Sequence, residues 1–182
     1  DNEMKDRVQT AFDKGIECIL ATQIRGDGHP TVWCQQHDHI TLAPAKARSY
    51  ELPSYCSQES ATLVRLLMLL PDPDERIREA VDGAMKWFDD HKLTGYRLER
   101  TGERGAPDEN TRLIADPNAG PLWGRFYDLD NCEIYVCDRD GVPRHSLEEI
   151  GIERRNGYSW YNDHPAQLLP LYENWKKASG DR

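Results

Sequence analysis

The deciding part of this sequence reads Trp33-Cys34-Gln35-Gln36-His37-Asp38 and then Pro44-Ala45-Lys46-Ala47-Arg48-Ser49-Tyr50-Glu51-Leu52-Pro53-Ser54. Both stretches belong to residues 29–57, a segment with three prolines and no sustained hydrophobic period. A long structured loop inside a compact domain is usually functional. Its aromatic, amide, imidazole, carboxylate and cationic side chains suit the recognition of a polar, anionic ligand.

Amphipathic helices are predicted on both sides of this loop. Upstream, apolar residues recur at steps of three and four from about Lys5 to Gln23, which predicts a helix whose stripe is Val8, Ala11, Phe12, Ile16, Ile19 and Leu20. Downstream, Ser57 can cap a second helix that ends near Pro71. Its inward positions are expected to be Ala61, Val64, Leu67 and Met68.

The start of a third helix, from about Pro73 to Asp90, carries its own signals. Asp72 can cap it, proline suits the first helical position, and Glu75 completes a capping box. The inward stripe is expected to be Ile77, Ala80, Val81, Ala84, Trp87 and Phe88. Because the connection to the second helix is short, the two should form an antiparallel helical hairpin.

The second half of the chain gives weaker signals. Residues 95–120 are polar and rich in Gly, Asp and Arg, so we expect an irregular surface segment. Short aromatic and branched runs predict brief strands at Phe126-Tyr127 and Ile134-Tyr135-Val136. Ser146 and Glu149 form a capping-box pattern for a short helix through Glu153.

A last helix is expected to start at Asp163 or His164 and end near Lys177, with Leu168, Leu169, Tyr172 and Trp175 inside. With the preceding elements it predicts a mainly α fold of helix pairs, in one domain over residues 1–182.

Composition excludes several classes of protein. With 38% hydrophobic and 30% charged residues, the chain is expected to be soluble and globular, and its longest apolar run, residues 66–70, is too short to cross a membrane. A net charge of -9 opposes binding to nucleic acid. The same charge would oppose any polyanion unless cations gather locally. The arginines that could do so are Arg48, Arg125, Arg139, Arg154 and Arg155.

The five cysteines are an odd number, so at least one is unpaired within the chain. Cys132 and Cys137 could bridge a short hairpin, or all could be free thiols that pack as small apolar groups. No signal peptide opens the sequence and no initiator methionine is present, which implies processing or truncation.

Four separated blocks resemble one known family, the family 10 polysaccharide lyases, which are pectate lyases. The first is the loop quoted above, and the others follow in the family's order: Pro121-Leu122-Trp123-Gly124-Arg125-Phe126-Tyr127-Asp128-Leu129, Asp138-Arg139-Asp140-Gly141 and Arg154-Arg155-Asn156-Gly157-Tyr158-Ser159-Trp160-Tyr161. They span about Gln23 to Trp175 and look like the later half of that family's catalytic module.

The resemblance implies a fold, an activity and roles for three arginines. The fold would be an incomplete (α/α) toroid, and the reaction would be calcium-assisted β-elimination of polygalacturonate. Arg48 matches the family's catalytic base, and Arg125 and Arg139 match arginines that grip uronate carboxylates. Calcium would be held mainly by acids in the earlier half, which this chain is not expected to contain. The resemblance also implies a secreted protein, which we expect to be a monomer.

Other residues of the same blocks are expected to contact substrate. They are Lys46, His37, Asp38, Tyr50, Trp123 and Tyr158. An arginine is an awkward base because it is normally protonated, so Arg48 would need crowding by other cations, such as Lys46, in a poorly solvated cleft. Aromatic planes can cover the apolar faces of sugar rings, and Trp33, Trp160 and Tyr161 were considered for this as well.

Alternative interpretations accompany these assignments. Arg48 could pair with Glu51 and merely order the loop, His37 could be structural, and the charge of Arg139 could be absorbed by its flanking aspartates. The aromatic residues could belong to the core. Cys34, His37, Asp38 and His39 could be viewed as a zinc cluster, although no second ligand pair follows at finger-like spacing. A nucleophilic Cys34 lacks any specific signature.

Three functional hypotheses follow. The first is a pectate lyase, in which Arg48 removes the hydrogen next to a uronate carboxylate and other cations stabilise the developing negative charge. The second is a fragment that binds pectate without turnover because it lacks the calcium site. The third is an unrelated helical interaction domain whose arginines form surface ion pairs.

Overall fold

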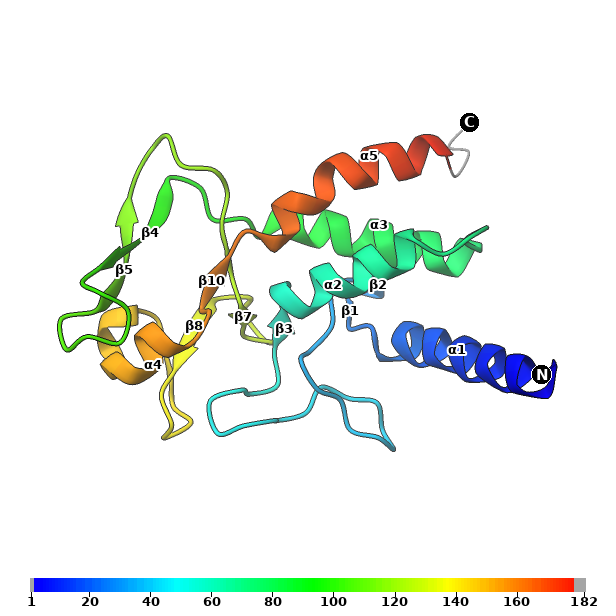
Figure 1. Cartoon of the computed structure of the whole chain (residues 1–182), viewed down its shortest axis with the longest axis horizontal. Helices are drawn as coiled ribbons and strands as arrows, with labels where there is room; N and C mark the ends of the chain where they lie inside the picture. The colour runs from blue at the N-terminus through cyan, green and yellow to red at the C-terminus, as the bar shows by residue number, and fades with distance from the viewer. Residues whose placement is uncertain (1, 179–182) are drawn as a thin grey trace.

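The computed structural model describes residues 2–178 and shows both helices and strands (Figure 1). The α-helices are α1 Asn2–Thr22, α2 Ser57–Met68, α3 Glu75–Asp90, α4 Ile152–Gly157 and α5 Leu169–Ala178. Two 3-10 turns are Leu147–Glu149 and His164–Leu168. The strands are β1 Arg25–Gly26, β2 His29–Pro30, β3 Tyr55–Cys56, β4 Tyr96–Thr101, β5 Asn110–Ala115, β6 Trp123–Gly124, β7 Phe126–Tyr127, β8 Ile134–Cys137, β9 Pro143–Arg144 and β10 Tyr161–Asn162.

The prediction of a mainly α, incomplete toroid is wrong. The protein is 41% helical and 19% strand, with the strands in several small sheets, so the fold is mixed α/β. Figure 1 shows α1, α2, α3 and α5 at one end of the molecule and α4 with the β4–β5 hairpin at the other. The predicted arrangement of packed helices therefore applies to only one end of the molecule.

The β4–β5 hairpin accounts for much of the error. It pairs Tyr96 with Ala115 through to Thr101 with Asn110 in antiparallel register, where an irregular segment was expected. Both strands are largely exposed or half-buried, with only Thr111 fully buried. Because neither face is clearly apolar, the alternating pattern that marks a half-buried strand is missing from this sequence.

The α2–α3 pair was predicted well. Both helices contribute to one apolar cluster, here called the helical core, whose buried members are Ile16, Val32, Trp33, Tyr55, Ala61, Val64, Leu67, Ala80, Val81, Ala84, Met85, Trp87, Phe88, Trp123, Tyr127 and Leu168. The predicted start of α3 was two residues early: the side chain of Asp74, not Asp72, caps it by accepting a hydrogen bond from Ile77 N at 2.9 Å. Ser57 is the first residue of α2 rather than its cap, and its hydroxyl donates to Gly124 O at 2.7 Å.

A second apolar cluster, the aromatic core, lies beside the small sheets. Its buried members are Tyr50, Cys56, Phe126, Tyr135, Val136, Cys137, Leu147, Ile150, Trp160 and Tyr161. In the antiparallel sheet β3-β7-β8-β9, strands β3 and β7 lie between the two cores, because successive side chains of these strands point to opposite faces. On β7, Phe126 joins the aromatic core and Tyr127 joins the helical core.

The helices near the chain ends differ from expectation in detail. Only Ile16 of the α1 stripe is buried, while Val8 is 61% exposed and Phe12 is 46% exposed. The capping box of Ser146 and Glu149 is present, but its 3-10 turn stops at Glu149 and a separate helix α4 follows. The final helix begins with a 3-10 turn that buries Leu168 but leaves Leu169 half-exposed.

The cysteines form no disulfide: Cys18, Cys34, Cys56, Cys132 and Cys137 are all free, so the alternative of buried or half-buried thiols applies to all but the exposed Cys18. A bridge between Cys132 and Cys137 would have to join the two cores, since each thiol packs with a different one. Within residues 2–178, no helix is both long and apolar enough to cross a membrane.

Candidate functional site

The loop that carries Arg48 is held by a tight turn. The Glu51 amide donates to Arg48 O and the Ala47 amide donates to Glu51 O, both at 3.0 Å. The carboxylate of Glu51 also accepts from the Arg48 amide at 3.0 Å. The carbonyl of Ser49 in this turn packs on Gly141, where φ is +78° and any Cβ would lie 3.0 Å from that oxygen. The turn that carries Arg48 therefore packs closely against the turn that carries Arg139.

Arg48 itself is paired rather than free. Its Nη1 donates to the Tyr50 hydroxyl at 3.0 Å and its Nε lies 3.2 Å from the Glu51 carboxylate, while 64% of the side chain stays exposed. The bond to Tyr50 and the charge of Glu51 raise the pKa of Arg48. Arg48 is therefore a cation in this state of the protein, which agrees with the alternative interpretation that it pairs with Glu51.

Tyr158 lies at the centre of the site. Its hydroxyl donates to the Glu51 carboxylate at 2.7 Å, and its ring meets that of Tyr50 edge-on at 5.2 Å. The guanidinium of Arg125 stacks over the Tyr158 ring at 4.5 Å, and that of Arg154 lies 5.8 Å from the same ring. Burial and the bond to Glu51 raise the pKa of Tyr158, so the phenol stays neutral.

Arg125 is nearly enclosed, with 12% of its side chain exposed, and it forms an ion pair with Glu59 of α2. Burial alone would lower the pKa of Arg125, but the hydrogen bond and charge of Glu59 outweigh burial and raise it. The Nε atom of Arg125 is buried without a hydrogen-bond partner, and so is Oε1 of Gln35, whose amide nitrogen donates to Glu51 at 3.3 Å. One donor and one acceptor at the site thus lack partners among the described residues.

Arg139 reaches the same site through Glu153. Arg139 and Arg154 both bind the Glu153 carboxylate, and the Arg154 guanidinium stacks over Tyr50 at 4.6 Å. A continuous set of contacts therefore links Arg139, Arg154, Tyr158, Arg125 and Arg48. Four of the five arginines predicted to gather therefore do so, and we call Arg48, Arg125, Arg139 and Arg154 the arginine cluster. Three acids pair with them: Glu51, Glu59 and Glu153.

Lys46 and Tyr50 lie next to the arginine cluster. Lys46 extends along the Gly141 turn, since its Nζ lies 3.7 Å from the position of a Cβ at that glycine. The Tyr50 ring is 5% exposed and serves as a platform for Arg48 and Arg154. Arg155 is used elsewhere: its guanidinium donates to Asn110 and to the carbonyls of Glu148 and Ile150.

His37 and Asp38 shape the loop. The His37 ring accepts from the Cys34 amide at 3.2 Å and its other nitrogen bonds Leu42 O at 2.9 Å, so both ring nitrogens are occupied by backbone. Asp38 Oδ1 accepts from the amides of Ile40 and Thr41, and these bonds keep the pKa of Asp38 low. These contacts favour the alternative in which the histidine is structural.

Trp123 is 2% exposed, and its indole nitrogen donates to Phe88 O at 2.8 Å. It belongs to the helical core and has no surface to offer a sugar. The same holds for Trp33, which is 1% exposed and donates to Ile19 O, and for Trp160 in the aromatic core. Tyr50 and Tyr158, in contrast, contact the arginines directly.

The described side chains do not form a metal site. Within residues 2–178, no group of three or more His, Cys, Asp and Glu side chains is arranged to hold a metal ion. Cys34, the first residue of the zinc alternative, instead directs its thiol to Ala45 O at 3.8 Å. The described residues therefore fit neither the zinc alternative nor a complete calcium site.

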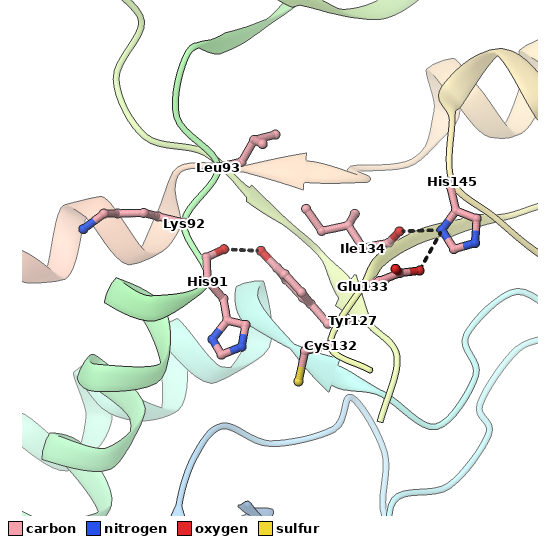
Figure 2. A pocket seen from close by; sticks show the side chains of 8 residues that line it. All are labelled: His91, Lys92, Leu93, Tyr127, Cys132, Glu133, Ile134 and His145. Carbon is pink, nitrogen blue, oxygen red and sulfur yellow. Dashed lines mark hydrogen bonds and ion pairs between the residues drawn. The ribbon is translucent and has the colours of Figure 1, made fainter. Parts of the chain in front are cut away.

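A pocket on the other side of β7 is a second place to consider (Figure 2). It has a volume of about 480 Å³ and is lined by Leu93, Tyr127, Ile134, His91, Lys92, Cys132, Glu133 and His145. Two of its polar side chains bind backbone: the Tyr127 hydroxyl donates to His91 O at 2.9 Å, and His91 Nδ1 bonds Trp87 O at 2.8 Å. None of the clustered arginines lines it, so the arginine cluster is the better candidate site.

The sequence placed Arg154 among the arginines that could gather but gave it no role at the site. In the structure its side chain is buried, and its guanidinium lies 4.6 Å from the Tyr50 ring and 5.8 Å from the Tyr158 ring. The arginine carries no local signal of burial. Its place in the Arg154–Tyr161 block was the one available hint.

Two solved structures similar to this chain are of a polysaccharide lyase. The family 10 polysaccharide lyase from Cellvibrio cellulosa matches with a TM-score of 0.84 and 31% identity, over 96% of this chain and 52% of that chain. A mutant of that lyase in complex with trigalacturonic acid matches with a TM-score of 0.83, over 96% of this chain and 53% of that chain. The chain spans about half the length of these relatives.

The sequence profile of the pectic acid lyase family matches residues 1–169. The chain therefore belongs to the pectic acid lyase family, as its four sequence blocks suggested. No curated protein sequence matches it.

Proposed function

We propose that this chain acts as part of a pectate lyase that cleaves polygalacturonate by β-elimination and releases 4,5-unsaturated oligogalacturonides. The observation that carries the proposal is the gathering of Arg48, Arg125 and Arg139 in one set of contacts that runs through Tyr50, Tyr158 and Glu153, although the chain has a net charge of -9. Clustered guanidinium groups match carboxylates in geometry and charge. The trigalacturonic acid bound to the related lyase is a ligand of this chemistry.

Each residue has a role in the proposed reaction. Arg48 removes the hydrogen on the carbon next to the uronate carboxylate, and the electron pair then expels the glycosidic oxygen two atoms away. Arg125, Arg139 and Lys46 hold carboxylates of the polymer and stabilise the negative charge that builds up.

The remaining residues of the site support these cations. Tyr158 and Tyr50 position the cations. His37 and Asp38 act indirectly by ordering the loop, and Trp123 supports the core behind it.

The base must first lose a proton. Tyr50 and Glu51 raise the pKa of Arg48, so the pair seen here opposes this role. Because the side chain is 64% exposed, Arg48 is free to leave Glu51 and turn toward Arg154, whose guanidinium lies over the same Tyr50 ring. Nearby positive charge favours the neutral form of a base. We therefore include a movement of Arg48 away from Glu51 in the proposal.

Calcium is part of the proposal only as a contribution from outside the described residues. The side chains of residues 2–178 offer no group of three or more His, Cys, Asp and Glu ligands, so the residue roles above do not depend on the metal. We further propose that the protein works outside the cell, because polygalacturonate is an extracellular polymer. We also propose that it works as a monomer.

The test compares Arg48→Lys with a matched control, Arg76→Lys. Arg76 is an exposed arginine on α3 that pairs with Glu17 and Asp74, so the control repeats the chemical change far from the site. Ultraviolet absorbance of the unsaturated product is followed on polygalacturonate with calcium. We expect Arg48→Lys to lower the rate about 10²- to 10⁴-fold, as for loss of a positioned base, while Arg76→Lys leaves it unchanged.

Equal rates for the two variants would overturn the role of Arg48. The other candidate is a fragment that binds pectate without turnover, which the lack of a complete metal site among residues 2–178 favours. Retention of the wild-type chain in a gel containing polygalacturonate, without any product, would support that candidate over the lyase.

A further inference from the structure

Glu153 is held by two arginines at once. Arg139 donates from Nε to Oε2 at 3.1 Å and from Nη2 to Oε1 at 2.9 Å. Arg154 donates from the same two nitrogens to the same two oxygens, at 2.9 Å and 2.6 Å. One carboxylate thus receives two parallel, two-pronged guanidinium contacts, which is the strongest arrangement that arginine offers to a carboxylate.

The three side chains are not equally fixed. Glu153 and Arg139 are 62% and 63% exposed, whereas Arg154 is 9% exposed. Arg154 stays in place without Glu153, because its guanidinium lies over Tyr50 at 4.6 Å and its carbonyl accepts from the Trp160 indole at 2.9 Å. The glutamate is the replaceable member, since exposed ion pairs contribute little to stability.

We propose that Arg139 and Arg154 form a clamp for one uronate carboxylate of the substrate, and that Glu153 occupies this clamp when no substrate is bound. The inference rests on the proposed function and extends it to two residues, Arg154 as a binding residue and Glu153 as a competitor. A uronate carboxylate is the same chemical group as the side chain it replaces, so it can accept the same four hydrogen bonds.

This exchange makes the clamp selective. A neutral sugar offers no carboxylate and leaves Glu153 in place, whereas a uronate restores every contact that the two arginines lose. Glu153 stays ionised over the working range, because hydrogen bonds from Arg154 and Arg139 lower its pKa to about 2. Glu153 therefore still competes with the uronate carboxylate for Arg139 and Arg154 at neutral pH, and this competition limits the affinity for short oligogalacturonides.

The test measures binding of trigalacturonate by calorimetry to the wild-type chain, Glu153→Ala and Glu133→Ala. Glu133 is also 62% exposed, so Glu133→Ala removes the same charge from a similar environment. This residue lies at the pocket on the other side of β7. We expect Glu153→Ala to bind about two- to fivefold more tightly, the effect of removing an exposed competing ion pair. Glu133→Ala should match the wild type.

A second variant tests the other arm. Arg154→Lys keeps the charge but loses the two-pronged contact, so we expect about tenfold weaker binding, the value of a charge-assisted hydrogen bond. Thermal unfolding of the variant verifies that it is folded. In Glu153→Ala/Arg154→Lys, the gain from removing the glutamate should vanish.

If the wild type binds and Glu153→Ala binds no more tightly than Glu133→Ala, the clamp is wrong and the proposed function stands. Absence of binding by the wild type and by both single glutamate variants would reject the proposed function, and the clamp with it. Galactotriose, which lacks carboxylates, should show no difference among the variants, and a gain with this sugar would also count against the clamp.

Discussion

At the scale of single residues, Glu51 orders the Arg48 turn. It is 2% exposed, and its carboxylate accepts from the Tyr158 hydroxyl, the Arg48 amide and the Gln35 side chain. Its sequence neighbours suggested the pairing with Arg48 but not the contact with Tyr158, which lies 107 positions away. Short-range pairs can be anticipated from spacing, whereas long-range ones depend on how the chain folds.

We expect Glu51→Gln to lower the free energy of unfolding by about 2 kcal/mol, because an amide cannot accept all the hydrogen bonds that the buried carboxylate receives. Urea unfolding measures the change, with Glu133→Gln as the control for an exposed glutamate. A shift of the same size in both variants would show that the buried contacts of Glu51 do not matter for stability.

A comparison of the wild type with Glu51→Gln also gives a prediction about pH. Burial would raise the pKa of Glu51, but hydrogen bonds from Tyr158 and the Arg48 amide outweigh it and hold the pKa below the ordinary value of 4.5. The stabilisation by the charged form is therefore complete above about pH 4.5 and is lost as the pH falls through the folded-state pKa. The gap in urea midpoint between wild type and Glu51→Gln should be smaller at pH 3 than at pH 7. A constant gap would contradict the assignment.

At the scale of elements, the helices with an apolar stripe and a capping signal were predicted, and the brief strands expected at Phe126-Tyr127 and Ile134-Tyr135-Val136 are confirmed as β7 and β8, whereas the weakly patterned hairpin β4–β5 was not predicted. The pattern of α3 is regular, and all but Ile77 of its expected stripe are buried. In contrast, β4 and β5 have no clear apolar face, so their hairpin is invisible to a search for alternation. The mistaken cap of α3 arose because Asp72 and Asp74 are both good capping residues, and spacing alone does not choose between them.

Two helical glycines provide a matched test of element packing. A Cβ on Gly83 of α3 would lie 2.3 Å from Pro30 O of β2, whereas one on Gly15 of α1 meets nothing within 4 Å. We expect Gly83→Ala to destabilise the protein by about 1–3 kcal/mol through overpacking. Gly15→Ala should be neutral or stabilising by up to about 1 kcal/mol through helix propensity. Urea midpoints of the two variants measure both effects, and equal midpoints would argue against close packing of α3 on β2.

At the scale of the whole molecule, the two cores are joined by the strands between them. Tyr55 and Tyr127 face the helical core, while their neighbours Cys56 and Phe126 face the aromatic core. Neither core can lose its packing without disturbing β3 and β7. This arrangement supports the prediction of one domain, which unfolding can test.

We expect urea unfolding followed by tryptophan fluorescence to coincide with unfolding followed by far-ultraviolet circular dichroism, as for a two-state domain. Trp160 lies in the aromatic core, whereas Trp33, Trp87 and Trp123 are buried in the helical core and Trp175 packs against it. The fluorescence of Trp160→Phe therefore reports on the helical core, and the difference between the wild type and this variant reports on the aromatic core. Separate midpoints for these two signals would indicate two independently unfolding parts.

The sequence by itself determined the family and the positions of the principal helices, and it picked out Arg48, Arg125 and Arg139 as candidate site residues, because these depend on local pattern and on ordered blocks of residues. Tertiary structure alone decided that the fold is mixed α/β, that Trp123 and Arg154 are buried, and that Glu153 pairs with Arg154 and Arg139. The reason is physical: burial and ion pairing depend on which distant segments meet, and spacing along the chain does not record those meetings.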